Sequence, residues 1–270
     1  NPTATTTYTV TATESGTGCQ GSANVTVTVG SNINVTTNTP APICAGQSTA
    51  LSASGATSYV WSPSTGLDNT TGANVNASPS TTTTYMVVGT SSGCTDTAYV
   101  TVVVNEAPIL TASADVAICE GASVGLFATG AASLSWSPAT GLNTTTGNQV
   151  IASPSQTTTY TVTGSNNGCS STEDITVTVN PNPVVSVSAG VTICAGQSTA
   201  LSASGASTYS WSPATGLDNT TAATVNASPD FTNTYSVIGT DANGCTGTAS
   251  VTVTVNNAPF APTSVVGTAH

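Results

Sequence analysis

The clearest pattern of apolar and polar positions lies at residues 249–255, which read Ala-Ser-Val-Thr-Val-Thr-Val. A strict period of two is typical of a β-strand with one face in a core and one face in water. Shorter alternating runs precede it at residues 198–204, 208–211, 224–227 and 234–239. Glycine, proline, asparagine and aspartate interrupt these runs, and no stretch has the spacing, cap and stop of a helix. The pattern therefore predicts an antiparallel, all-β fold.

The runs belong to a unit that is repeated along the chain. Residues 43–56 and 193–206 are identical. Each full copy has one cysteine near its start, a tryptophan 17 residues later, and a second cysteine 50 or 51 residues after the first. Repetition at this period indicates tandem domains in series. The predicted boundaries are 1–29 for the C-terminal half of a repeat, 30–104, 105–179 and 180–255 for three full repeats, and 256–270 for a linker, the start of a next domain or an exchanged strand.

Short, proline-containing segments separate the repeats, for example Asn105-Glu106-Ala107-Pro108. Such linkers favour an extended and semi-rigid chain. An additional first strand follows each linker directly, at residues 109–114 and 184–189, which gives six strands per repeat. We therefore expect tandem Ig-like β-sandwich repeats arranged as an extended rod. Because Cys19 is the second cysteine of a unit whose first half is absent, the chain is expected to be part of a longer protein.

The seven cysteines favour an oxidising, extracellular setting. If the six strands run up and down, both cysteine loops of a repeat fall at the same end of the sandwich. One disulfide per repeat is then expected, and a bond of this kind typically contributes ~2–4 kcal/mol. The predicted pairs are Cys44 with Cys94, Cys119 with Cys169 and Cys194 with Cys245, and Cys19 is expected to bond to an upstream cysteine.

One tryptophan in each repeat is expected to dominate its core. These residues are Trp61, Trp136 and Trp211. The remaining apolar residues of the repeats are mainly valine, leucine, isoleucine and alanine, so a single large aromatic side chain contributes much of the buried area.

The charge of the chain excludes several functions. It has no lysine and no arginine, and its eleven carboxylates give a net charge of −11. Binding to the phosphates of nucleic acid or to anionic lipid headgroups therefore has no electrostatic source. No apolar run approaches the ~18 residues that a membrane span needs, so no membrane insertion is expected in this region.

Catalysis is not expected. The one histidine is His270, and the cysteines are assigned to disulfides, so nucleophile and base arrangements have no usable base. Calcium is the metal that isolated carboxylates suit best, and the candidates are Asp68 and Asp218 in the motif Gly-Leu-Asp-Asn-Thr. The middle repeat has Asn143 at this position. The alternative interpretation of Asp68 and Asp218 is that they are solvated turn residues. We expect no other cofactor.

The motifs Cys-Ala-Gly-Gln-Ser, Tyr-x-Trp-Ser-Pro-x-Thr-Gly-Leu, Ala-Ser-Pro, Thr-x-Thr-Tyr and Gly-Cys resemble the tandem Ig-like, PKD-like repeats of Bacteroidota surface proteins. Gliding-motility adhesins and other substrates of type IX secretion carry such repeats. The resemblance covers the three full units and the leading half unit. Typical PKD repeats have Trp-Asp-Phe-Gly-Asp-Gly where this chain has Trp-Ser-Pro, so an acidic turn is missing. Asp96-Thr97-Ala98 resembles the O-glycosylation signal of Bacteroidota, which makes Thr97 a candidate site.

The resemblance implies a secreted, cell-surface protein, and three hypotheses follow. The first is a non-catalytic stalk, the repeat region of a long adhesin or extracellular fibre, whose partners are other repeats of the same protein. The second is a carbohydrate-binding module that contacts surface glycans. The third is a subunit of an extracellular filament that exchanges a strand within residues 256–270 with neighbouring subunits.

Overall fold

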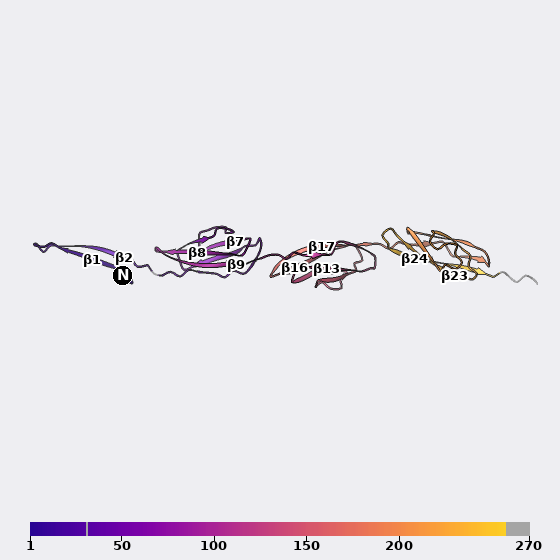
Figure 1. Ribbon diagram of the computed structural model, residues 1–270, viewed down its shortest axis with the longest axis horizontal. Coiled ribbons are helices and arrows are strands. Elements are labelled where there is room, and N and C mark those ends of the chain that lie inside the picture. The colour runs from indigo at the N-terminus through magenta and orange to yellow at the C-terminus, as the bar shows by residue number, and fades with distance from the viewer. Residues whose placement is uncertain (31, 258–270) are drawn as a thin grey trace, which may run out of the picture. The chain divides into compact units, whose positions relative to one another are not determined.

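The computed structural model describes residues 1–30 and 32–257 (Figure 1). Within this part of the chain all regular secondary structure is β-strand, from β1 to β24, which confirms the all-β prediction. The predicted role of residues 256–270 falls almost wholly outside the described residues. The chain divides into two compact units, which comprise Asn1–Leu110, Gly130–Ser133 and Gly164–Ser171, and Thr111–Thr129, Leu134–Thr163 and Thr172 onward.

The first unit begins with an antiparallel hairpin of β1 (Thr6–Thr13) and β2 (Gln20–Val27). Its apolar side chains are exposed; Tyr8, for example, is 46 % exposed. By strand register Tyr8 corresponds to Tyr85 in the first full repeat, which is fully buried. The hairpin thus carries the core side chains of a sandwich without the strands that cover them elsewhere in the chain.

The first full repeat lies in the same unit and has two facing sheets. Their inner faces bury Leu51, Trp61, Val75, Tyr85 and Val87, among others. One sheet has the order β3-β5-β7 and the other β6-β8-β9, and a short parallel pair joins β4 to β10. The strand bounds are β3 Thr36–Thr37, β4 Ile43–Cys44, β5 Thr49–Ser54, β6 Ser58–Ser62, β7 Asn74–Ala77, β8 Thr83–Ser91, β9 Cys94–Val102 and β10 Val104–Asn105.

The strands of the second repeat form sheets of the same kind, with the orders β11-β13-β15 and β12-β17-β16-β14. Most of these strands belong to the second unit. Leu126, Trp136, Tyr160 and Val162 are buried. The bounds are β11 Thr111–Ala112, β12 Val116–Cys119, β13 Val124–Thr129, β14 Ser133–Ser137, β15 Gln149–Ala152, β16 Thr158–Asn166 and β17 Cys169–Asn180.

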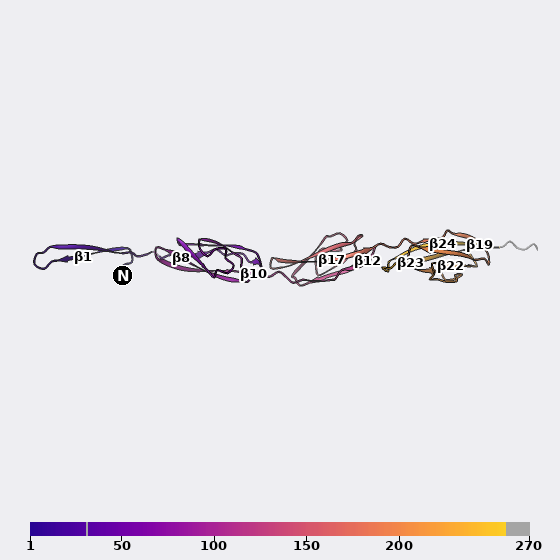
Figure 2. The same cartoon turned by 90° about the horizontal axis from the view of Figure 1, so that it is seen from above.

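The third repeat, also in the second unit, shows the topology most completely. Its sheets have the orders β18-β20-β22 and β19-β24-β23-β21, and Figure 2 shows β19 alongside β24. Seven strands in two antiparallel sheets, with one parallel edge pair, form an Ig-like sandwich. The bounds are β18 Ser186–Val187, β19 Val191–Cys194, β20 Thr199–Ser204, β21 Thr208–Ser212, β22 Thr224–Ala227, β23 Asn233–Thr240 and β24 Thr246–Asn256.

The prediction of six strands missed one. The five predicted runs of the third repeat overlap β20 to β24, and the predicted first strand at 184–189 contains β18. The additional strand, β19, ends at Cys194 and pairs in parallel with β24, with Ile193 opposite Val255. No strand was predicted at residues 191–194, and it is the pairing with β24 that shows this segment to be one.

The tryptophan and the tyrosine of the sequence motifs form hydrogen bonds from the core to one loop of each repeat. In the third repeat, Trp211 is 2 % exposed and donates its indole N–H to Ala222 O at 3.0 Å. The hydroxyl of buried Tyr235 donates to Thr215 O at 2.9 Å, next to Gly216. Trp61 with Tyr85, and Trp136 with Tyr160, make the corresponding bonds. Each polar group of these aromatic side chains is therefore satisfied on burial.

Candidate functional site

The two disulfides of the described chain join different repeats. Cys44 is bonded to Cys169 over a sequence separation of 125, and Cys119 is bonded to Cys245 over 126. The predicted pairs Cys44–Cys94, Cys119–Cys169 and Cys194–Cys245, and with them one disulfide within each repeat, are therefore wrong. Cys19, Cys94 and Cys194 form no disulfide within the described residues.

Parallel pairing at the sheet edge explains why a disulfide within a repeat cannot form. Cys194 lies opposite Asn256, the last residue of β24, whereas Cys245 precedes the first residue of that strand. Eleven residues of extended chain span about 35 Å, and a disulfide needs Cα atoms within ~7 Å. The same arrangement holds in the first repeat, where Cys44 lies opposite Asn105 and Cys94 begins β9.

Each repeat therefore has two poles with different cysteines. The first cysteine of a repeat lies at the pole where the last strand ends and the chain leaves for the next repeat. The second cysteine lies at the other pole, beside the Gly-Cys turn that joins the last two strands. The first cysteine of one repeat consequently meets the second cysteine of the following repeat. We call each such meeting point a junction.

In the first junction Asn105 holds both sides together. Its carbonyl oxygen accepts the backbone N–H of Ala45 at 3.1 Å and lies 3.6 Å from Cys169 Sγ. Its side-chain amide donates to Asn167 O at 3.1 Å. Cys169 is 1 % exposed. A hollow of about 460 Å³ lies beside the disulfide, lined by Gln47, Ala107, Gly168 and Ser170 together with Cys44, Ala45 and Cys169.

In the second junction Asn180 takes the place of Asn105. Its carbonyl oxygen accepts the backbone N–H of Glu120 at 2.8 Å and lies 4.0 Å from Cys245 Sγ. Asn182 donates from its side-chain amide to Glu120 O at 3.1 Å. Cys245 is fully buried. Both junctions thus combine backbone and side-chain amide hydrogen bonds with a covalent bond, which suits a chain that has no lysine and no arginine.

The two disulfides overlap along the sequence. The loop closed by Cys44 and Cys169 shares residues 119–169 with the loop closed by Cys119 and Cys245. Consecutive repeats are therefore connected twice, once by the peptide linker and once by sulfur. Severing the linker at Glu106 would leave the first and second repeats covalently joined.

The carboxylates of the calcium candidates Asp68 and Asp218 accept hydrogen bonds from neighbouring asparagines. Asp68 accepts both N–H groups of Asn76, the backbone one at 2.8 Å and the side-chain one at 2.9 Å. Asp218 accepts the same two bonds from Asn226. These bonds favour the charged form and lower the pKa of both carboxyl groups below 3.8. Within the described part of the chain no three histidine, cysteine, aspartate or glutamate side chains are grouped as a metal site.

The glycosylation candidate Thr97 is exposed on β9. Its neighbour Asp96 accepts the backbone N–H of Val35 at 2.8 Å, which lowers the pKa of that carboxyl group. Asp96 therefore ties β9 to the residue that precedes β3, and the neighbouring Thr97 is exposed to solvent.

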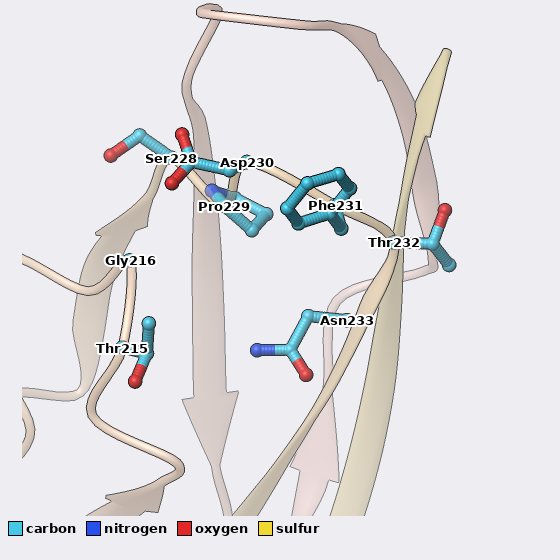
Figure 3. A pocket seen from close by; sticks show the side chains of 8 residues that line it. All are labelled: Thr215, Gly216, Ser228, Pro229, Asp230, Phe231, Thr232 and Asn233. Carbon is cyan, nitrogen blue, oxygen red and sulfur yellow. The ribbon is translucent and has the colours of Figure 1, made fainter. Parts of the chain in front are cut away.

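A separate pocket in the third repeat was not predicted from the sequence. It has a volume of about 240 Å³ and is lined by residues 215–216 and 228–233. Phe231 is 79 % exposed. Figure 3 shows Phe231 and Pro229 on one side of the hollow and Thr215 and Asn233 on the other. The first and second repeats have Thr81 and Gln156 where the third has Phe231.

Among the described residues there is no helix with the length and apolarity that a membrane span requires. The sole histidine, His270, lies outside the described residues.

No protein-family model and no curated protein matches this chain. Solved structures that match it include tandem Ig fragments. A three-domain titin fragment is 11 % identical over 84 % of this chain and 100 % of that chain, with a TM-score of 0.43. Extracellular domains 3–5 of Drosophila OTK are 10 % identical over 81 % and 95 %, with a TM-score of 0.35. A Ca²⁺-stabilised adhesin of an ice-binding Antarctic bacterium is 16 % identical over 93 % and 81 %, with a TM-score of 0.37.

Proposed function

We propose that this chain is a non-catalytic stalk, the repeat region of a long secreted adhesin or extracellular fibre. The observation that carries the proposal is that both disulfides bridge successive repeats, Cys44 to Cys169 and Cys119 to Cys245. A second covalent connection at each junction limits hinge motion about the linker. A spacer that holds an adhesive end away from a cell needs that stiffness.

Several further properties support this function. The repeat boundaries 30–104, 105–179 and 180–255 place each junction at a short linker, so the domains follow one another without long flexible segments. The disulfides favour an extracellular location, because reducing compartments do not maintain them. The motif resemblance supports the proposal that the protein lies at the surface of a Bacteroidota cell, with type IX secretion as its export route. O-glycosylation of exposed Thr97 is part of the same proposal.

Small-angle X-ray scattering of the purified chain tests the stalk. A compact globule of this length has a radius of gyration of ~18 Å, and we expect a value well above it for repeats in series. Cys44→Ser removes the first junction bond and should broaden the distribution of intramolecular distances. Cys19→Ser is the matched control and should leave the distribution unchanged. A radius near that of a globule would contradict the proposal.

The exposed Phe231 supports a second candidate function, binding of carbohydrate at the third repeat. An exposed aromatic ring beside Asp230 and Asn233 combines an apolar face with polar groups, as ligand pockets do. The tryptophans do not contribute, because all three are buried. A glycan array probed with the wild-type chain and with Phe231→Thr, which restores the residue of the first repeat, tests this function. Equal binding by both proteins would contradict it.

A further inference from the structure

The backbone after the first cysteine is held in the same way in all three full repeats. Gln47, Ala122 and Gln197 each donate their backbone N–H to the carbonyl of the cysteine three residues earlier, at 2.9–3.0 Å. The residue after the cysteine donates its backbone N–H to the carbonyl of the asparagine that directly follows the repeat; for Ala195 and Asn256 the distance is 3.0 Å. Cys194 is therefore held as Cys44 and Cys119 are, although only the latter two are bonded.

The side chains around Cys194 also match those of an occupied junction. Cys44, Ala45 and Gln47 line the first junction, and Cys194, Ala195 and Gln197 belong to the identical stretch 193–206. The third repeat thus presents the same half of a junction at the pole where its last strand ends, with Cys194 exposed.

The other half of each junction is a Gly-Cys turn. Gly168 and Gly244, with φ of +83° and +82°, precede the bonded Cys169 and Cys245. The hairpin of β1 and β2 carries the same pair, because Gly18 has φ of +70° and precedes the exposed Cys19. The first full repeat carries it too, because Gly93 has φ of +80° and precedes Cys94, which forms no disulfide within the described residues. The described chain therefore contains the open first-cysteine half at Cys194 and two open Gly-Cys turns, at Cys19 and Cys94.

We infer that Cys194 is one half of a third junction and forms a disulfide with the cysteine of a Gly-Cys turn on another repeat of this kind. This inference rests on the stalk function proposed above. It names the partner for the pole of the third repeat at which Cys194 is exposed. Two cysteine thiols are oxidised to a disulfide while one oxidised glutathione is reduced to two glutathione thiols, so protons and electrons balance. The partner turn belongs either to a repeat that follows in the same polypeptide or to a second copy, through its Cys19 or Cys94.

The first arm of the test uses the chain extended by a copy of residues 105–179 placed after Val255. The protein is equilibrated with reduced and oxidised glutathione, alkylated and mapped by mass spectrometry. We expect Cys194 to be bonded to the cysteine in the Gly-Cys turn of the added repeat, at the separation of 125 or 126 seen in the existing junctions. That result assigns the partner to the same polypeptide.

The second arm uses the unextended chain under the same conditions. Covalent oligomers that disappear in Cys194→Ser and in the Cys19→Ser, Cys94→Ser double variant assign the partner to a second copy. A symmetric Cys194–Cys194 bond, or a Cys194 that is alkylated in both arms, overturns the inference. If the bonds Cys44–Cys169 and Cys119–Cys245 are found in the same samples, the stalk proposal survives that failure; if they are missing, both fail.

Discussion

Cys194 lies opposite Asn256 at the end of β24, while Cys245 stands immediately before the strand begins. This relationship places the two cysteines of one repeat at opposite poles. As a consequence, each disulfide forms between two repeats and not within one repeat. The mechanical coupling of successive domains therefore depends on a strand of four residues.

Digestion after glutamate distinguishes the two disulfide patterns directly. Cleavage of the alkylated, unreduced chain at Glu14, Glu106, Glu120 and Glu173 gives the peptides 1–14, 15–106, 107–120, 121–173 and 174–270. We expect peptide 15–106 to be joined to 121–173, and 107–120 to 174–270, as the bonds Cys44–Cys169 and Cys119–Cys245 require. Mass spectrometry with and without reduction identifies the pairs. Joining of 107–120 to 121–173 would contradict the structure.

Acid should destabilise the first and third repeats through Asp68 and Asp218. Hydrogen bonds from Asn76 and Asn226 lower the pKa of these carboxyl groups in the folded protein below 3.8. Their stabilisation is therefore complete above the unfolded value and is lost as the pH falls through the folded value. We expect the melting temperature of the Asp68→Asn, Asp218→Asn double variant to change less than that of the wild type between pH 5 and pH 2.

The second repeat supplies a natural reference for this experiment. There Asn143 accepts the backbone N–H of Ile151 at 2.7 Å with a neutral amide, so this position cannot titrate. Thermal unfolding followed by circular dichroism at each pH gives the comparison. Parallel pH profiles for the wild type and the double variant would refute the assignment.

The buried hydroxyl of Tyr235 should contribute to stability through one hydrogen bond. Tyr235→Phe removes the donor to Thr215 O, a contact of 2.9 Å, and leaves that carbonyl without this partner. We expect the free energy of unfolding to fall by about 1–2 kcal/mol. Tyr99→Phe, at a side chain that is 64 % exposed, is the control and should change little. Denaturation with urea, followed by tryptophan fluorescence, measures both variants.

Substitutions at Gly216 and Gly244 distinguish the cost of a left-handed backbone conformation from the cost of steric crowding. Both have positive φ, +80° and +82°. A Cβ on Gly216 would lie 2.8 Å from the Tyr235 hydroxyl and 3.0 Å from Pro229 Cα, whereas a Cβ on Gly244 would have no neighbour within 4 Å. We expect Gly244→Ala to cost about 1 kcal/mol for its left-handed backbone and Gly216→Ala about 1–3 kcal/mol more for the clash. Equal losses in urea denaturation would show that the loop at Gly216 relaxes.

The sequence alone determined the repeated unit, the all-β class and the positions of most strands, because the alternation of apolar and polar residues reports which side of a strand faces the core. It also identified the tryptophans, since a single large aromatic in a small apolar core has few alternatives to burial. These properties are local, and each can be read from neighbouring residues.

The tertiary structure decided which cysteines meet. Equal spacings of 50 or 51 residues favour a bond within each repeat, but spacing along the chain says nothing about the pole at which a side chain emerges. That is set by the parallel pairing of β19 with β24, a contact between segments about 60 residues apart. Phe231 likewise stands in a loop that no periodicity describes, and only the fold places it beside a pocket. Contacts between distant segments are a property of the packed chain, and this protein builds its junctions from them.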